Sequence, residues 1–185
     1  MKKIIFVLIM LLSLSILNAQ AEDIKIYNTD DWKWSIPFGK TYNYTDITVS
    51  RVIDGDTLQL ESGERVRLIG IDTPEMHESN KLYRDSQRSG EDTNTIQKLG
   101  KEAFQFTRKL VEGKRVSLEF DVEKYDKYNR LLAYVYLKAG GTFVNAEIIK
   151  QGYASLMTIP PNLKYESLFK KLYEEARANK RGLWK

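Results

Sequence analysis

The 185-residue sequence contains no cysteine and only one histidine, His77. Without cysteine the chain has no disulfide framework, no zinc-thiolate site, no thiolate nucleophile and no cysteine for lipid attachment. One histidine excludes sites that need two imidazoles, such as paired-histidine ribonucleases, histidine-rich zinc centres and H-E-x-x-H proteases. The fold must therefore depend on its hydrophobic core, and the lone histidine, in a polar stretch, is expected on the surface.

The apolar run from Ile4 to Leu17 is shorter than the roughly 20 residues that a membrane-spanning helix needs. Two lysines precede this run and the A-x-A motif of residues 19–21 follows it, as in a signal peptide. We therefore predict a signal peptide over residues 1–21 and an exported protein, secreted or periplasmic, with no stable membrane association after cleavage. An uncleaved N-terminal anchor is the alternative.

Excess charge of either sign is scarce. The net charge is +4, and two of the positive charges lie in the predicted signal peptide, so the mature chain keeps only +2. This weak overall charge says little about a nucleic-acid partner, and any attraction for phosphate must be local. The mature length suits one domain, which we predict to be monomeric.

Residues 22–45 are polar and aromatic without a clear period, so we predict an irregular N-terminal extension before a domain of residues 46–185. Alternating apolar and polar residues predict strands over residues 47–53, 57–60, 65–71, 115–122 and 131–137. A 3.6-residue period predicts helices ending at Gly113, Gly152 and Gly182. This order suits an α+β fold, a five-stranded OB-type Greek-key β-barrel with about three packed helices.

The first chemical motif is the turn Asp54-Gly55-Asp56-Thr57. Its two carboxylates are two residues apart, so on an extended chain they would project to the same side. Paired oxygen ligands in a tight turn suit Ca²⁺ or Mg²⁺. A plain hairpin turn is the alternative, because Asp-Gly between strands is a strong hairpin signal.

The second motif is a strand that carries Arg67 within an apolar run and ends in Asp72-Thr73-Pro74-Glu75. A buried arginine is costly without an anionic partner, and its fork of donors suits a phosphate. Strict alternation would put Arg67 and Asp72 on opposite faces, so their convergence requires a bulge, for which Gly70 is suited. The alternative is a strand with a salt-bridged arginine and a proline turn.

The third motif is the polar segment Asp126-Lys127-Tyr128-Asn129-Arg130, which leads into the apolar strand of residues 131–137. It delivers a second arginine at the head of that strand. On its own, the segment favours the alternative, a solvated hairpin loop.

Together, the three motifs resemble the thermonuclease (staphylococcal nuclease) family. That family's pattern has an I-D-G-D-T turn, an R-L-x-x-x-D-T-P-E strand end and a D-K-Y-G-R-x-L-A-Y hairpin in the same order. The resemblance covers roughly residues 47–184 of this chain. It implies an OB-type, calcium-dependent endonuclease and exonuclease that acts on DNA and RNA.

The resemblance also implies roles for individual residues. The implied calcium ligands are Asp56, Asp72 and the backbone carbonyl of Thr73, with Asp54 as a neighbour beyond the direct ligands. The implied catalytic residues are Glu75 as general base and the phosphate-clamping Arg67 and Arg130, while Lys127 and Tyr128 would touch a neighbouring substrate phosphate. Such a site combines a Lewis acid, charge stabilisation at the phosphate and an activated water.

The sequence departs from the family pattern in three places. Residues 76–97 are longer than the family's loop, and we expect a solvated insertion there, with gating or a second ion site as alternatives. Thr158 and Ile159 stand where the family has tyrosines that cover a substrate base, and Tyr153 is expected to pack in the core rather than replace them. Asn129 replaces a glycine, which is mild because Asn tolerates left-handed geometry.

Two other functions fit the same motifs. One is a non-catalytic OB-type nucleic-acid-binding module, and the other is an exported interaction protein that binds calcium only for stability. Every position that the resemblance marks as catalytic is occupied, which favours the nuclease.

Overall fold

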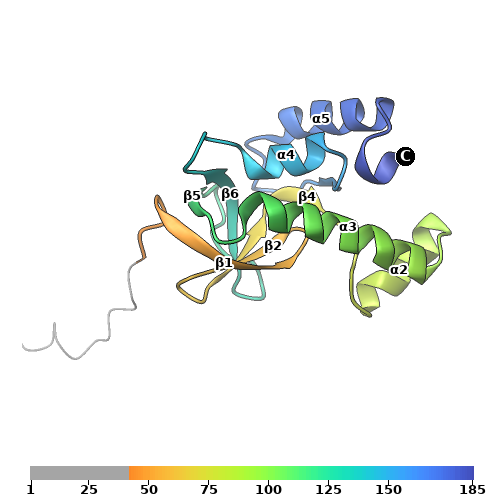
Figure 1. The fold of residues 1–185 in the computed structure, drawn as a ribbon, viewed down its shortest axis with the longest axis horizontal. Coiled ribbons are helices and arrows are strands. Elements are labelled where there is room, and N and C mark those ends of the chain that lie inside the picture. Colours follow the sequence, from red (N-terminus) through yellow and green to blue (C-terminus); the bar gives the residue numbers. More distant parts are fainter. Residues whose placement is uncertain (1–41) are drawn as a thin grey trace, which may run out of the picture. The chain divides into compact units, whose positions relative to one another are not determined.

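The computed structural model describes residues 42–185 (Figure 1). The predicted signal peptide and residues 22–41 of the predicted extension lie outside them, so both stay predictions. The strands are β1 (Ile47–Asp54), β2 (Thr57–Leu60), β3 (Arg65–Leu68), β4 (Gly70–Asp72), β5 (Arg115–Glu119), β6 (Leu131–Leu137) and β7 (Ser155–Met157). The helices are α2 (Asn80–Ser89), α3 (Thr93–Val111), α4 (Val144–Lys150) and α5 (Glu166–Ala178), followed by the 3₁₀ turn η2 (Gly182–Trp184).

Five strands close a barrel in the order β1-β2-β3-β6-β5, with β1 also paired to β5. All neighbours are antiparallel except β3 and β6, which run parallel. Alternate residues such as Val49, Leu58 and Val66 point inward and are fully buried, as a half-buried strand requires. The predicted α+β fold with an OB-type barrel is confirmed. The strand predicted over residues 115–122 is β5, which is shorter than predicted because it ends at Glu119.

The predicted strand over residues 65–71 is two strands that separate at Ile69. The Ile69 N–H still bonds to the Ala133 carbonyl of β6 at 3.1 Å, whereas β4 leaves the barrel and pairs with β7. Gly70 has a φ of +83°, and a β-carbon there would overlap the ring of Phe169. The sequence predicted a bulge at or near Gly70, and the structure has a break between two strands there instead, because β4 leaves the barrel to pair with β7.

A buried asparagine on α4 stabilises this break. The Asn145 amide donates to the Ile69 carbonyl at 2.9 Å and to the Ala133 carbonyl at 3.3 Å. Its oxygen accepts the Val135 N–H at 3.0 Å, so the side chain is satisfied although it is fully buried. Sequence reasoning did not single out Asn145, because its partners come from two strands distant in the chain.

Residues 76–97, predicted as a solvated insertion, contain helix α2 and the start of α3, so the fold has four helices where about three were predicted. Ser79 caps α2 by accepting the Leu82 N–H, and Asp92 caps α3 by accepting the Thr95 N–H. Leu82 is the only buried residue of α2, so no apolar period revealed the helix. Figure 1 shows α2 lying beside the first half of α3.

Helix α3 passes very close to the segment that follows β4. A β-carbon at Gly100 would lie 2.6 Å from the Glu75 carbonyl oxygen, so only glycine permits this approach. From the same helix, the Thr107 hydroxyl donates to the Gly55 carbonyl at 2.7 Å. Helix α3 thus holds both the β1–β2 turn and the Glu75 segment in place. None of the helices within residues 42–185 has the length and apolarity needed to cross a membrane.

Candidate active site

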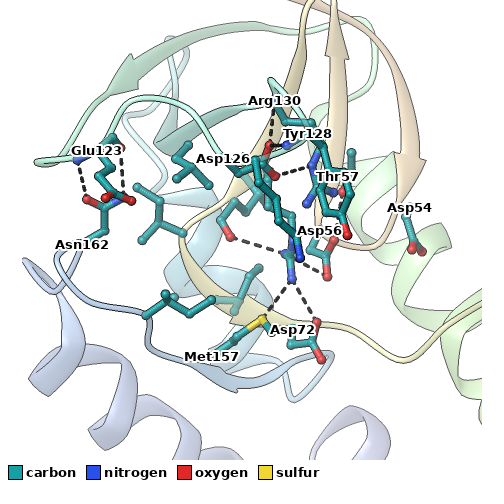
Figure 2. A pocket seen from close by; sticks show the side chains of 18 of the residues that line it. Asp54, Asp56, Thr57, Asp72, Glu123, Asp126, Tyr128, Arg130, Met157 and Asn162 are labelled. Atoms are coloured by element: carbon teal, nitrogen blue, oxygen red, sulfur yellow. Dashed lines mark hydrogen bonds and ion pairs between the residues drawn. The ribbon is translucent and has the colours of Figure 1, made fainter. Parts of the chain in front are cut away.

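A cavity of about 560 Å³ opens where the β1–β2 turn, β3, β4 and the loop before β6 meet. Apart from Thr73, which is buried, every site residue predicted from the sequence lines this cavity: Asp54, Asp56, Arg67, Asp72, Glu75, Lys127, Tyr128 and Arg130. We call Asp54, Asp56, Arg67, Asp72 and Glu75 the barrel side of the site, and residues 126–130 the loop side. The structure therefore brings the three sequence motifs together around one space (Figure 2).

On the barrel side, Arg67 lies between two carboxylates. One guanidinium nitrogen is 2.9 Å from Asp56 Oδ2 and the other is 2.9 Å from Asp72 Oδ1. The Arg67 side chain is only 12% exposed, and it also contacts Met157 Sδ of β7. The break at Gly70 permits this arrangement, because it brings Arg67 and Asp72 to the same side of the chain.

Asp56 joins the β1–β2 turn to the end of β4. Its Oδ2 accepts both the Thr73 N–H at 2.9 Å and the Thr73 hydroxyl at 3.0 Å, while Oδ1 accepts the Thr57 hydroxyl. Asp56 is 4% exposed, so these bonds replace most of the water around its charge.

Asp54 differs from Asp56 although both come from the same turn. It lies at the end of β1, apart from the Arg67 ion pairs, and its Oδ1 accepts the Gly55 N–H at 2.8 Å (Figure 2). Burial, followed by the negative charge of Asp56, raises the pKa of Asp54 to about 6. The prediction that Asp56 rather than Asp54 is the direct metal ligand stays a prediction.

An unpredicted residue, Lys81 of α2, reaches the same cluster. Its ammonium nitrogen is 3.0 Å from the Thr73 carbonyl oxygen, 3.1 Å from Asp72 Oδ1 and 3.1 Å from Glu75 Oε1. Burial alone would lower the pKa of Lys81, but the charges of Asp72 and Glu75 outweigh it and raise that pKa. Burial also raises the pKa of Asp72, against the opposing effect of Lys81 and Arg67. The only signal in the sequence for Lys81 is Ser79, a residue suited to cap the helix that carries this lysine.

The loop side is organised by Asp126. Its Oδ1 accepts the N–H groups of Tyr128 and Arg130 at 2.9 Å each, and its Oδ2 accepts Arg130 Nε at 2.7 Å. Burial acts to raise the pKa of Asp126, but these hydrogen bonds outweigh it and lower the pKa. Asn129 has a φ of +59°, the left-handed geometry expected of a residue that replaces glycine. The loop therefore aims Arg130 through contacts within itself.

Tyr128 is 68% exposed at the edge of the cavity, with Lys127 Nζ 5.0 Å and Arg130 Cζ 5.5 Å from its ring centre. Ile159, where the family resemblance expects a tyrosine, is also exposed and lines the cavity. Tyr153 does not replace it, because its ring stacks on Phe106 and packs against the core, as predicted. Tyr128 is thus the exposed aromatic side chain nearest to both cations of the loop side.

The groups on the barrel side that could bind a metal ion are all oxygens. Within the part of the chain that the structure describes, no three His, Cys, Asp or Glu side chains cluster closely enough to hold a metal by themselves. A site here would combine the carboxylates of Asp56 and Asp72 with the Thr73 carbonyl and water, which suits a hard cation such as Ca²⁺. A cation, the Lys81 ammonium, already contacts two of these three residues. The residues present therefore fit calcium.

The charges around the cavity favour a cation as well. Four carboxylates, from Asp54, Asp56, Asp72 and Glu75, face the positive charges of Arg67 and Lys81 on the cavity wall. The remaining cations, Lys127 and Arg130, lie on the loop side, where Arg130 is paired with Asp126. The barrel side is thus net negative, and the loop side offers the charges that an anionic substrate needs.

A family model described as "Staphylococcal nuclease homologue" matches residues 65–185 of this chain. The chain is 40% identical over 139 residues to the thermonuclease of Staphylococcus intermedius, covering 74% of each sequence. It is 34% identical over 139 residues to the thermonuclease of Staphylococcus hyicus, covering 74% of this chain and 73% of that one. It is also 32% identical over 164 residues to the endonuclease YncB of Bacillus subtilis, covering 85% and 71% of the two.

Proposed function

The chain belongs to the staphylococcal nuclease family, and we propose from this premise that it is a calcium-dependent nuclease that hydrolyses phosphodiester bonds in DNA and RNA. The single observation that supports this most is the convergence of Arg67, Arg130 and Glu75 on one open cavity. An oxygen donor set next to two arginines is the combination that metal-assisted phosphoryl chemistry needs.

Substrate binding is assigned to the loop side. Arg130 and Lys127 supply positive charge for neighbouring phosphates, and the exposed ring of Tyr128 offers a flat surface for a base or sugar. Stacking on an aromatic side chain is worth about 1–3 kcal/mol per base and tolerates any sequence. Because the backbone and not the base edges would be contacted, the site supports both DNA and RNA as substrates.

Catalysis is assigned mainly to the barrel side. Asp56, Asp72 and the Thr73 carbonyl would hold the calcium ion, which when bound supplies Lewis-acid polarisation of the phosphate. Arg67 stabilises the charge that grows on the phosphoryl oxygens, aided by Arg130 from the opposite wall. Glu75 accepts a proton from the attacking water or orients it, an effect typically worth about 10² to 10⁴ in rate.

The proposal is tested by incubating the full chain with single-stranded DNA, double-stranded DNA and RNA, each with CaCl₂ and with a chelator. Digestion of all three with calcium, and of none with the chelator, is expected. Arg67→Met should abolish most of the activity. Arg65→Met is the matched control, because Arg65 is an exposed arginine at the start of the same strand.

Two outcomes would contradict the proposal. Digestion that continues in the chelator would remove the metal from the mechanism. Binding of nucleic acid without digestion when calcium is present would favour the non-catalytic binding module instead.

A further inference from the structure

Helix α2 brings a lysine into the oxygen cluster that the proposed function assigns to calcium. Lys81 Nζ lies 3.0 Å from the Thr73 carbonyl and 3.1 Å from Asp72 Oδ1, two donors of the proposed metal site. It lies equally close to Glu75, the proposed general base. A primary ammonium group with three oxygen partners uses all three of its N–H donors.

The position of Lys81 is fixed by its helix. Ser79 caps α2 through the Leu82 N–H, and the Leu82 side chain, next to Lys81, is 1% exposed. At the other end, the Ser86 hydroxyl donates to the Glu91 carbonyl at 2.6 Å, which ties the helix to the connection before α3. The backbone of Lys81 is therefore anchored, while its four-carbon side chain, 25% exposed, has a path to solvent.

A lysine and a calcium ion cannot both use these oxygens comfortably. Calcium binds oxygen at about 2.3–2.6 Å, and the ammonium nitrogen is 3.0 Å from the Thr73 carbonyl oxygen. Two cations on one oxygen lie at most the sum of those distances apart, and at such a separation in a partly buried site they repel each other strongly.

We propose that Lys81 is an internal competitor for calcium: when no metal is bound its ammonium group holds the Thr73 carbonyl and Asp72, and calcium binding displaces it. This inference rests on the proposed function for the identity of the ion. It gives the segment of residues 76–97 a role, because α2 supplies the ammonium group that pairs with Asp72 and Glu75. It also means that Lys81, which is not itself a calcium ligand, lowers the affinity of the site for calcium.

The first experiment compares calcium binding by calorimetry in the full chain and in Lys81→Met. The variant is expected to bind calcium at least tenfold more tightly, and without calcium to unfold at a lower temperature than the wild type. Arg84→Met is the matched control, since it removes one positive charge from the exposed side of the same helix. The control should bind calcium within about twofold of the wild type.

The second experiment measures displacement directly in the wild-type chain. Acylation of lysines by an amine-reactive ester, quantified by mass spectrometry, should rise at least fivefold at Lys81 when calcium is added. Lys101, exposed on α3, should change by less than twofold.

The outcomes separate this inference from the proposed function. Equal or weaker calcium binding by Lys81→Met, or unchanged acylation of Lys81 at saturating calcium, overturns the competition even if the chain digests DNA. Tighter binding by Lys81→Met together with calcium-induced acylation supports the competition even if no nucleic acid is digested. Failure of both proteins to bind calcium overturns the inference together with the metal dependence.

Discussion

Arg67 and Arg130 line the same cavity, but the barrel side and the loop side hold them in different ways. Arg67 is 12% exposed and lies between carboxylates of the β1–β2 turn and of β4. Arg130 is 27% exposed and is held by Asp126 of its own loop. On the barrel side the catalytic charges are thus also structural charges, whereas on the loop side a charge can be removed without opening the core.

The carboxyl groups of the two sides show the same contrast. Burial first, and then Asp56, raises the pKa of Asp54 to about 6, so the folded chain binds protons there more tightly than the unfolded chain. That group makes the fold less stable as the pH rises from about 4 to 6. Hydrogen bonds lower the pKa of Asp126 despite burial, so its carboxylate stabilises the fold above its ordinary pKa. The barrel side therefore holds a carboxylate whose charge destabilises the fold and which a bound cation would stabilise. The carboxylate of the loop side is already stabilised by its own hydrogen bonds.

The largest expected effect comes from removing each arginine in turn. Arg67→Met and Arg130→Met should each lower the rate of hydrolysis about 10²- to 10³-fold, because each removes a donor to the phosphate. Arg67→Met should also cost about 3 kcal/mol of unfolding free energy, since it leaves the buried Asp56 without a charged partner and leaves Asp72 with Lys81 alone. Arg130→Met should cost less than about 1 kcal/mol. Urea unfolding in a chelator and initial rates in calcium measure the two quantities, and equal losses of stability would remove the distinction between the two sides.

The second effect concerns the strand break that the barrel side needs. Gly70→Ala should lower stability by about 3 kcal/mol, because it places a β-carbon against Phe169 at a φ of +83°. Hydrolysis should fall with it, since the break brings Arg67 to Asp72. Gly63→Ala is the control: its φ is +89°, but a β-carbon there meets nothing within 4 Å. This control should lose only about 1 kcal/mol and keep its activity, and similar losses in both variants would show that backbone strain alone acts at Gly70.

The barrel and the motifs could be predicted because local patterns determine them. Alternation revealed all five barrel strands, and the mismatch between Arg67 and Asp72 indicated a bulge near Gly70, where the structure has a break between β3 and β4. Helix α2 could not be predicted in this way, because only Leu82 is buried and the helix owes its place to packing beside α3. Strand β7 was missed because its three residues pair with β4, more than 80 positions earlier in the chain.

The candidate site was predictable to the same extent. The family motifs identified residues that lie around the cavity, and the structure brings all of them together, with Thr73 buried behind the wall against Asp56. Lys81 and Asn145 were not predicted, since each acts on backbone carbonyls or carboxylates supplied by other elements. No spacing within the sequence encodes such contacts.

The smallest expected effect is a pH dependence on the loop side, tested with Asp126→Asn. At pH 7 the variant should unfold at a slightly lower temperature, because it loses the ion pair with Arg130 but keeps an oxygen for the two backbone N–H groups. The folded pKa of Asp126 lies below its ordinary value of 3.8, so the contribution is complete above that value and is lost as the pH falls through the folded pKa. The difference between wild type and variant should therefore stay the same from pH 7 down to about 4 and shrink only as the pH is lowered further, through the folded pKa. Glu91→Gln, at an exposed carboxylate before α3, should show no such change. A difference that stays constant with pH would mean that Asp126 orders its loop through hydrogen bonds that do not need its charge, and the two sides of the site would then differ in burial alone.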